Sequence, residues 1–337
     1  MAQAATRQIA NTVQPAEGLL LAADVGGTYA RVGLVRTGAT PVVAQYHKYR
    51  CADHASLGAI LKDFLEATGV VGITHGAVAC AGYVLDDTVI NTNLPWKVSL
   101  AQIRADLNLA DLLLVNDFTA IAYATRYVES NDVMPIAPAT AALDGGPVLV
   151  VGPGTGLGAA VRIPGSVPTI LSTEAGQAAL TASTPLEVEI LTRLMRKASH
   201  VPMEQTLSGP GLANLYAVLA DIRGAARRNL SPNDVTAAAL SGADAIAREA
   251  LGVFCGWLGS TIGNLVLTYG AQGGVFLAGG ILPQMREFLQ ASDFVARFHD
   301  KGAMRPVLER VPVSLIEHGQ LGVLGAAGWY LDRQRPA

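Results

Sequence analysis

Two turns rich in glycine and threonine each join a pair of apolar segments in this sequence. Their residues are Gly26, Gly27 and Thr28 in "DVGGTYAR", and Gly152, Gly154, Thr155 and Gly156 in "GPGTGLG". Because glycine lacks a Cβ, the backbone N–H groups of such turns approach an anion closely, and a threonine adds a hydroxyl donor. Both turns therefore have the composition of a loop that binds phosphate.

The second turn differs from two common nucleotide-binding loops. No Gly-Lys-Ser/Thr follows it, as a P-loop requires, and a strand rather than a helix is expected next, unlike a Rossmann fingerprint. Pro153 has no N–H and stiffens the loop, so the amides of Gly154, Thr155 and Gly156 are the predicted phosphate contacts. A further pair, Gly279–Gly280 after "GVFLA", predicts bare backbone against which a flat ring or a ribose lies.

An acidic residue precedes the first turn. Asp24 ends the apolar run "LLLAAD", where an ordinary surface acid is not expected. Mg²⁺ keeps several waters and binds through one or two carboxylates beside phosphates. Asp24 is therefore predicted to hold Mg²⁺ through water, and the alternative is an aspartate that bonds the amides of an ordinary β-turn.

Polar residues also follow a later strand. Asn116 and Asp117 in "LLLVNDFTAIAYA" lie where a predicted strand gives way to a helix, a place from which side chains face a binding site. One interpretation makes Asp117 the N-cap of that helix. The other makes it a general base that accepts a proton from an attacking hydroxyl, as an aspartate does in phosphoryl transfer.

Two glutamates lie in loop-like segments among small residues. Glu174 occurs in "LSTEAGQAAL" and Glu204 in "PMEQTLSGPG". A pair of carboxylates that each bridge neighbouring hydroxyls suits a sugar site. The alternative is that both are solvated surface glutamates.

The hydrophobic pattern predicts two α/β domains, each a mixed sheet flanked by helices. Strands over 18–25, 30–36 and 41–50 open an antiparallel sheet, and a helix over 56–69 and strands over 76–82 and 112–117 follow. Residues 130–147 are predicted to be loop-like, with a domain boundary near 125–145. We expect a polar tail over 1–18, a smaller domain over 19–127 with 318–337, and a larger domain over 128–317.

The second half begins again with a strand, a Gly/Thr turn and a strand over 148–163, which echoes the opening hairpin. The remaining predicted elements are helices over 186–199, 211–221, 234–240 and 243–268, strands over 273–280 and 311–317, and a closing helix over 321–332. Residues 250–285 carry no charge, and glycines at 252, 256, 259 and 263 have GxxxG spacing. Polar residues and "YGAQGG" divide this stretch, which favours a buried helix packed through its glycine face over a membrane span.

Composition limits the partners and the compartment. The formal charge of −3 and pI of about 6.1 give no general electrostatic reason to bind nucleic acid or an anionic membrane. Cys51, Cys80 and Cys255 lie far apart, which fits free thiols in the cytoplasm. Residues 1–17 lack the apolar core of a secretory signal. Charge-poor helices are consistent with a homodimer.

Seven motifs together resemble the bacterial ATP-dependent glucokinases of the hexokinase–actin-like superfamily. In chain order they are "DVGGTYAR", "TNLPW", "VNDFTAIAYA", "GPGTGLG", "TEAGQ", "LSGPGLANLY" and "GGVFLAGGILP". The resemblance covers residues 19–330 and implies a hexokinase-type, actin-like ATPase fold with a central cleft for ATP, Mg²⁺ and a hexose. It implies phosphorylation of glucose to glucose 6-phosphate, a cytoplasmic step of glycolysis.

The resemblance also implies residue roles by position. Asp24, Gly26, Gly27 and Thr28 match the first phosphate motif, Gly152, Gly154, Thr155 and Gly156 the second, and Gly279 and Gly280 the adenosine motif. Asp117 matches the catalytic base, and the matches to sugar-binding residues are Asn93, Asn116, Glu174 and Glu204. Gln177 stands where the family usually has a sugar-contacting His, and Tyr29 stands where Asn is frequent. A glutamine both donates and accepts hydrogen bonds, so hydroxyl binding is expected to persist, and the hexose preference and affinity stay open.

Other functions compete with glucose phosphorylation. Gln177 leaves open a kinase for mannose, fructose or an amino sugar, and a weakly catalytic sugar-sensing paralogue is a further alternative. The related sugar-responsive repressors carry a helix-turn-helix domain before the first strand and a cysteine-rich zinc motif, and this sequence has neither. An actin- or chaperone-like ATPase has no need of Glu174 and Glu204 in their loops.

Overall fold

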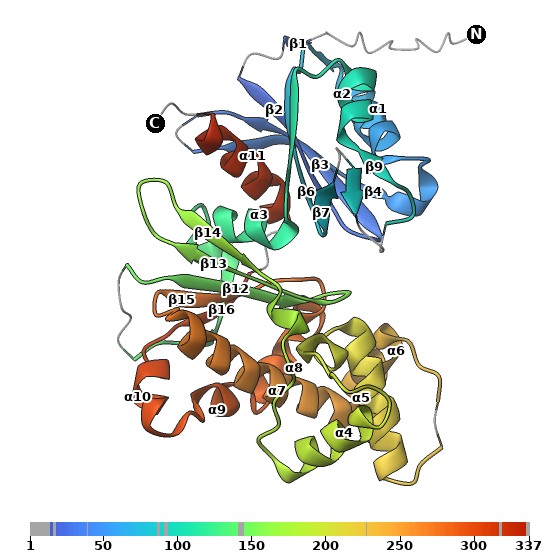
Figure 1. Cartoon of the computed structure of the whole chain (residues 1–337), viewed down its shortest axis with the longest axis vertical. Helices are drawn as coiled ribbons and strands as arrows, with labels where there is room; N and C mark the ends of the chain where they lie inside the picture. Colours follow the sequence, from blue (N-terminus) through green and yellow to red (C-terminus); the bar gives the residue numbers. More distant parts are fainter. Residues whose placement is uncertain are drawn as a thin grey trace, which may run out of the picture. The chain divides into compact units, whose positions relative to one another are not determined.

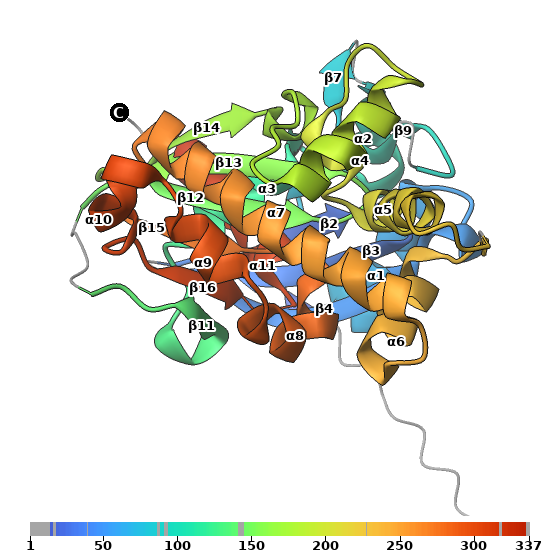
Figure 2. The ribbon, with the colours of Figure 1, turned by 90° about the horizontal axis from the view of Figure 1, so that it is seen from below.

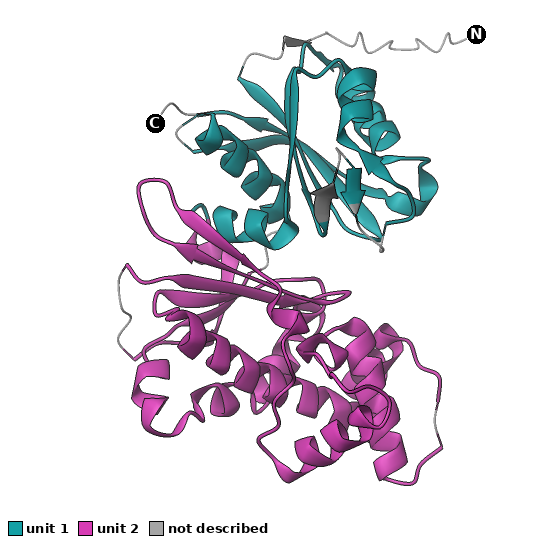
Figure 3. Cartoon of the chain, viewed as in Figure 1, with its two compact units in different colours: residues 1–127, 319–337 teal, residues 128–318 magenta. Residues whose placement is uncertain are grey.

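The chain forms two compact units, each with its own sheet and helices. The computed structural model describes residues 14–334 except 16–17, 39, 86–87, 91–93, 141–144, 227 and 317–318. One unit comprises residues 1–127 with 319–337 and the other residues 128–318 (Figure 3). Most of the predicted tail over 1–18 lies outside the described residues. Within it, β1 (Gln14–Pro15) pairs in parallel with β5 (Val70–Val71).

The first unit is built on a five-stranded sheet in the order β10-β6-β2-β3-β4 (Figure 1). Its strands are β2 (Leu19–Val25), β3 (Tyr29–Arg36), β4 (Val42–Arg50), β6 (His75–Cys80) and β10 (Asp111–Val115). The first three are antiparallel, as predicted, whereas β6 and β10 run parallel to β2. The carboxyl ends of β2, β6 and β10 therefore meet at one edge of the sheet.

Helices cover both faces of this sheet. Buried residues of α1 (Leu57–Thr68) and α2 (Leu100–Leu107) pack on one face, and those of α3 (Asp117–Ala124) and α11 (Leu321–Arg333) pack on the other. Ser56 caps α1 through its side chain, and Gly69 ends it in the left-handed conformation, as the sequence indicates. Three short strands form a separate small sheet: β7 (Tyr83–Leu85), β8 (Thr88–Ile90) and β9 (Val98–Ser99).

The second unit has a six-stranded sheet in the order β11-β16-β15-β12-β13-β14. The strands are β11 (Val133–Ala137), β12 (Val148–Pro153), β13 (Leu157–Ile163), β14 (Thr169–Thr173), β15 (Gly274–Leu277) and β16 (Val313–Ile316). The expectation that 130–147 is loop-like throughout is wrong, because β11 pairs antiparallel with β16. It is an edge strand, where Pro135 is tolerated because one side needs no ladder donor.

The helices of the second unit gather around one long central helix. They are α4 (Pro185–Met195), α5 (Gly209–Ile222), α6 (Pro232–Ser241), α7 (Ala245–Tyr269), α8 (Arg286–Ala291), α9 (Phe294–His299) and α10 (Arg305–Leu308). α7 contacts α5, α6, α9 and β12 (Figure 2). Among the helices of the described residues, α7 alone is long and apolar enough to span a membrane, and 78% of its most apolar 18-residue window is buried. The prediction of a buried helix followed by a short strand is confirmed.

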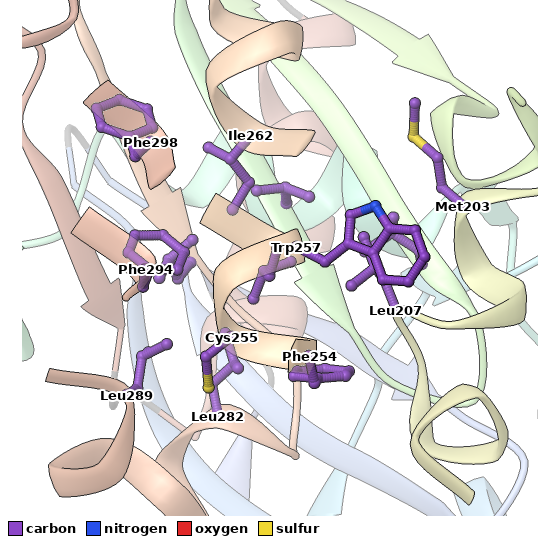
Figure 4. Packing of buried hydrophobic residues seen from close by; sticks show 14 of the residues in the cluster. Met203, Leu207, Phe254, Cys255, Trp257, Ile262, Leu282, Leu289, Phe294 and Phe298 are labelled. Carbon is purple, nitrogen blue, oxygen red and sulfur yellow. The ribbon is translucent and has the colours of Figure 1, made fainter. Parts of the chain in front are cut away.

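Trp257 is the largest fully buried side chain along α7. It lies toward Met203 and Leu207 on one side of the helix, while Phe294 and Phe298 lie on the other side (Figure 4). Its indole N–H donates to the Thr181 carbonyl at 2.6 Å, so that the one polar atom of the ring is satisfied within the core. The core of this unit therefore extends on both sides of α7.

Only part of the predicted glycine face of α7 makes a close contact. A Cβ at Gly263 would lie 2.8 Å from the Phe298 carbonyl oxygen, and one at Gly259 would clash with the Phe294 carbonyl. By contrast, a Cβ at Gly252 would have no atom within 4 Å. The second GxxxG pair therefore packs closely against α9, and Gly252 does not belong to that interface.

These two glycines provide a matched test of helix packing. Gly259→Ala should lower the free energy of unfolding by about 1–3 kcal/mol, because the methyl group displaces α9. Gly252→Ala should leave stability unchanged or raise it by up to about 1 kcal/mol, since alanine favours the helix. Urea titrations of both variants measure the difference. Equal stabilities would contradict the assigned packing.

Candidate active site

The first glycine turn, Gly26–Thr28, is held in place by Cys51. The thiol of Cys51 donates to the Gly26 carbonyl at 3.3 Å, and its backbone N–H donates to the Thr28 carbonyl at 2.9 Å. Trp96 of the "TNLPW" motif donates its indole N–H to the Cys51 carbonyl at 3.3 Å. Cys51 thus connects two of the motifs.

The prediction of free thiols is confirmed, because Cys51, Cys80 and Cys255 are all buried and form no disulfide.

Asp24 is paired with an arginine of the neighbouring strand. Its Oδ2 accepts from Nη1 of Arg31 at 3.3 Å, and the side chain of Asp24 is 19% exposed. Burial raises the pKa of the Asp24 carboxyl above its ordinary value, and the guanidinium opposes this shift. Gly322 of α11 lies so close that a Cβ there would be 2.7 Å from Oδ2. The β-turn alternative for Asp24 is wrong, because among the described residues its carboxylate bonds Arg31 and not the turn amides.

Tyr29 supports a lysine beside the turn. Its exposed ring lies under Lys48 of β4, with the ammonium nitrogen 3.8 Å from the ring centroid. Such a cation–π contact contributes about 0.5–1 kcal/mol at an exposed site. The contact gives Tyr29 a structural role that an asparagine in its place does not have.

Asn116 and Asp117 begin α3 at the carboxyl end of β10. Asn116 is the N-cap, because its Oδ1 accepts from the Thr119 N–H at 3.1 Å. The interpretation that assigned the cap to Asp117 is wrong. Asp117 is the first helical residue, and its Oδ1 accepts from the Phe118 N–H at 3.0 Å. With β6 between β10 and β2, this pair lies about 10 Å along the sheet edge from the first turn.

The second glycine turn meets the third glycine pair at one edge of the other sheet. β12 and β15 are parallel, so Gly152, near the end of β12, lies beside Gly279, which follows β15. A Cβ on Gly279, whose φ is +89°, would lie 2.6 Å from the Pro153 carbonyl oxygen. This approach requires glycine at 279, because a side chain there is blocked and strained.

Hydrogen bonds within the second turn decide which amides it presents. The Gly154 N–H donates to the Gly156 carbonyl, and the Gly209 N–H, at the start of α5, donates to the Gly154 carbonyl, both at 2.8 Å. The Gly154 amide is therefore already bonded. Thr155 and Gly156 remain as the predicted amide donors to phosphate.

Glu204 and Gln177 lie together beside the second turn. Glu204 Oε1 accepts from the Gln177 side-chain amide at 2.8 Å, and Oε2 accepts from the Leu157 N–H at 3.2 Å. Glu204 is therefore not a solvated surface glutamate. Glu174 precedes the 3₁₀ turn Ala175–Gln177; its carbonyl accepts from the Gln177 N–H at 2.9 Å, and its side chain is exposed.

Two predicted features remain, the sugar contact of Asn93 and the Mg²⁺ ligand Asp24. Asn93 lies outside the described residues. Across the described part of the chain, no three His, Cys, Asp or Glu side chains gather as a metal site. Asp24 therefore stands as a single carboxylate candidate, which fits a cation whose other ligands are waters and phosphate oxygens.

Several contacts of the site were not predicted from the sequence. Arg31 was within reach of prediction, because a hairpin whose tip is 26–28 pairs residue 24 with residue 31. His200, whose Nε2 lies 2.8 Å from the Gln177 carbonyl oxygen, and Cys51 come from distant segments. No local pattern indicates such contacts, because tertiary packing alone brings these segments together.

Comparisons with known proteins agree over almost the whole chain. A family model described as Glucokinase matches residues 21–333. A glucokinase-like protein of Xylella fastidiosa is 49% identical over 320 residues, covering 93% of this chain and 95% of that protein. A glucokinase of Saccharophagus degradans is 37% identical, covering 92% and 97% of the two chains.

Comparison with solved structures agrees with these sequence matches. The crystal structure of a glucokinase from an Antarctic psychrotroph has a TM-score of 0.83 at 35% identity, covering 94% of this chain and 99% of that one. A ROK family glucokinase from Streptomyces griseus, solved with glucose and AMPPNP, has a TM-score of 0.64 at 19% identity, covering 94% and 100%, and shows the fold alone. The predicted α/β fold class, that of hexokinase-type actin-like ATPases, is confirmed.

The N-cap role of Asn116 can be measured through stability. Asn116→Ala should lower the free energy of unfolding by about 1 kcal/mol, because the Thr119 N–H loses its acceptor. Asn116→Ser retains a hydroxyl oxygen at the cap and should keep most of that stability. Thermal or urea unfolding of the two variants checks this, and equal losses would argue against the cap.

Proposed function

The chain belongs to the glucokinase family, and from this premise we propose that it transfers the γ-phosphoryl group of ATP to the 6-hydroxyl of D-glucose. The observation that carries the proposal is the start of α3. There Asn116 uses Oδ1 to cap the helix, and Asp117 follows at the sheet edge that also bears the Gly26–Thr28 turn. A carboxylate on the same sheet edge as a turn suited to phosphate supports phosphorylation of a hydroxyl.

In this proposal the sugar is held by side chains with complementary donors and acceptors. The Asn116 amide group donates to a sugar hydroxyl, since its oxygen is engaged by the helix. Glu174 and Glu204 accept hydrogen bonds from hydroxyls, and Gln177 and Asn93 contribute further contacts. Fixing several hydroxyls at once orients the 6-hydroxyl for attack, which supplies much of the rate enhancement in a reaction of this kind.

Asp117 is the proposed general base. It accepts the proton of the 6-hydroxyl as the oxygen attacks the γ-phosphorus, and ADP leaves from the opposite side. By taking this proton, the carboxylate neutralises the positive charge that develops on the attacking oxygen. Backbone N–H groups stabilise the negative charge on the phosphate oxygens.

The nucleotide contacts are assigned to the three glycine segments. Gly26, Gly27 and Thr28 would hold phosphate, as would the Thr155 and Gly156 amides. Gly152 and Gly154 shape the second turn, and Gly279 and Gly280 leave space for the adenosine. The close approach of Gly152 and Gly279 supports this assignment, because it keeps one strand edge free of side chains.

Asp24 fits Mg²⁺ bound through water. It offers one half-buried carboxylate at a strand end next to the first turn, and Arg31 holds this carboxylate in position. When bound, Mg²⁺ would neutralise charge on the phosphate oxygens of ATP.

The cellular setting follows from the same proposal. We infer a cytoplasmic enzyme that acts in glycolysis, and the three free buried cysteines support a reducing compartment. The net charge of −3 supports a small-molecule substrate rather than nucleic acid or a membrane surface. A homodimer stays a prediction.

A second candidate is a kinase for another hexose, such as mannose, fructose or an amino sugar. The observation that favours it is Gln177, whose amide N–H is committed to Glu204. An imidazole in this position presents different donors and acceptors to the sugar. Initial rates with these sugars in a coupled ADP-release assay separate the two candidates.

The general base can be tested by an isosteric change. Asp117→Asn should lower kcat by about 10²–10⁴, because an amide does not accept the hydroxyl proton. It keeps an oxygen for the Phe118 N–H, so glucose binding should be retained. The control is Asp106→Asn on the exposed surface of α2. Turnover near that of the control would reject the role of Asp117.

Glucose recognition can be tested by calorimetry. Wild-type protein should release or absorb heat on titration with glucose, and Gln177→His should change the affinity without abolishing binding, because both side chains form hydrogen bonds with hydroxyls. Mannose titrated in parallel serves as the comparison. Absence of heat from glucose with either protein would reject glucose as the substrate.

A further inference from the structure

Glu204 joins two segments that carry different ligands in the proposed function. Its Oε2 accepts from the Leu157 N–H at the start of β13, directly after the phosphate-side turn. Its Oε1 accepts from the side chain of Gln177, in the turn that follows Glu174 on the sugar side. One carboxylate therefore bridges the proposed nucleotide and sugar contacts of this unit.

The chemistry of the carboxylate fixes the orientation of Gln177. An ionised carboxylate only accepts hydrogen bonds, so the amide nitrogen of Gln177 must face Glu204. The amide oxygen then faces away from Glu204. The His200 ring nitrogen, 2.8 Å from the Gln177 carbonyl oxygen, contacts the backbone of the same turn.

The carboxylate of Glu204 also lies against the second turn. A Cβ on Gly156 would be 2.5 Å from Glu204 Oε2, so only glycine allows this approach. Gly156 in turn accepts from the Gly154 N–H within the tip. The Glu204 side chain therefore packs against the peptide groups that are proposed to hold phosphate.

The backbone of Glu204 reaches the same tip by a second route. Its carbonyl accepts from the Ser208 hydroxyl at 2.7 Å, and that hydroxyl caps α5 by accepting from the Gly211 N–H at 3.0 Å. The first N–H of α5, from Gly209, donates to the Gly154 carbonyl at 2.8 Å. Both routes end at the residues of the second turn.

We propose that Gln177 is a positioning residue that, through Glu204, transmits sugar occupancy to the second phosphate turn and so strengthens nucleotide binding. This inference rests on the proposed function. A hydroxyl of the bound sugar donates a hydrogen bond to Glu204 and restricts the positions that its carboxylate can take. This restriction fixes the backbone of Gly156 and Leu157. The glutamine amide holds the carboxylate in this position by its hydrogen bond to Oε1.

The test measures the affinity for ADP with and without glucose. The coupling factor is the ratio of the two dissociation constants, obtained by calorimetry with MgADP at zero and at saturating glucose. Wild-type protein should give about 5-fold or more. Gln177→Leu removes the amide at similar volume and should bring the factor to about one. Its affinity for MgADP without glucose should stay within about twofold of wild type, which shows that the second turn is folded.

A double substitution tests the pair directly. In Gln177→Glu two carboxylates face each other, and coupling should be lost. Adding Glu204→Gln restores a donor and an acceptor, because the new amide donates to position 177 while its oxygen accepts from Leu157. The double variant should therefore couple more strongly than either single variant, which a merely structural role of position 177 does not predict.

Gln205→Leu is the matched control, because this neighbour is exposed and should couple like wild type. The proposal is overturned by a wild type without coupling, by coupling in Gln177→Leu within twofold of wild type, or by a double variant no better than both singles. In each of these cases, phosphorylation of glucose by wild-type protein leaves the proposed function standing. A wild type that neither binds nor phosphorylates glucose rejects both.

Discussion

Parallel pairing of strands that end at the same edge is the constraint on which the candidate site depends. In the first unit it aligns the ends of β2, β6 and β10, and in the second it aligns β12 with β15. Segments that follow these strands are therefore neighbours whatever their distance in sequence. This is how Asp117 and the Gly26–Thr28 turn share one edge, and how Gly152 and Gly279 share another.

Close backbone contact is the second condition, and it explains where glycine is required. At Gly156 the absent side chain admits the carboxylate of Glu204, and at Gly322 it admits that of Asp24. In both places a glycine from one segment meets an acidic side chain from another. The two acids are thereby held beside the two glycine turns, Glu204 next to Gly156 and Asp24 on the strand that leads into Gly26–Thr28.

Local pattern predicted the elements whose signal is local. The opening strands, the helix capped by Ser56 and the long helix α7 carry clear periodicity. The edge strand β11 was missed because residues 130–147 are rich in Pro, Ala and Gly, a composition typical of loops. For the site, motifs identified Glu204 and Gln177 separately, but their hydrogen bond and the anchoring of the first turn by Cys51 depend on packing between distant segments. One interpretation placed the cap at Asp117 and not at Asn116, because asparagine and aspartate suit that position equally well.

The N-cap of α3 has a consequence for how this position changes during evolution. Asn116 engages its oxygen with the helix, and its amide nitrogen is the only other polar group on the side chain. Aspartate and serine supply the oxygen without the amide, and glutamine places both groups one methylene too far. A lineage that changes residue 116 to one of these three therefore gives up either helix capping or the amide donation that the proposed function assigns to Asn116.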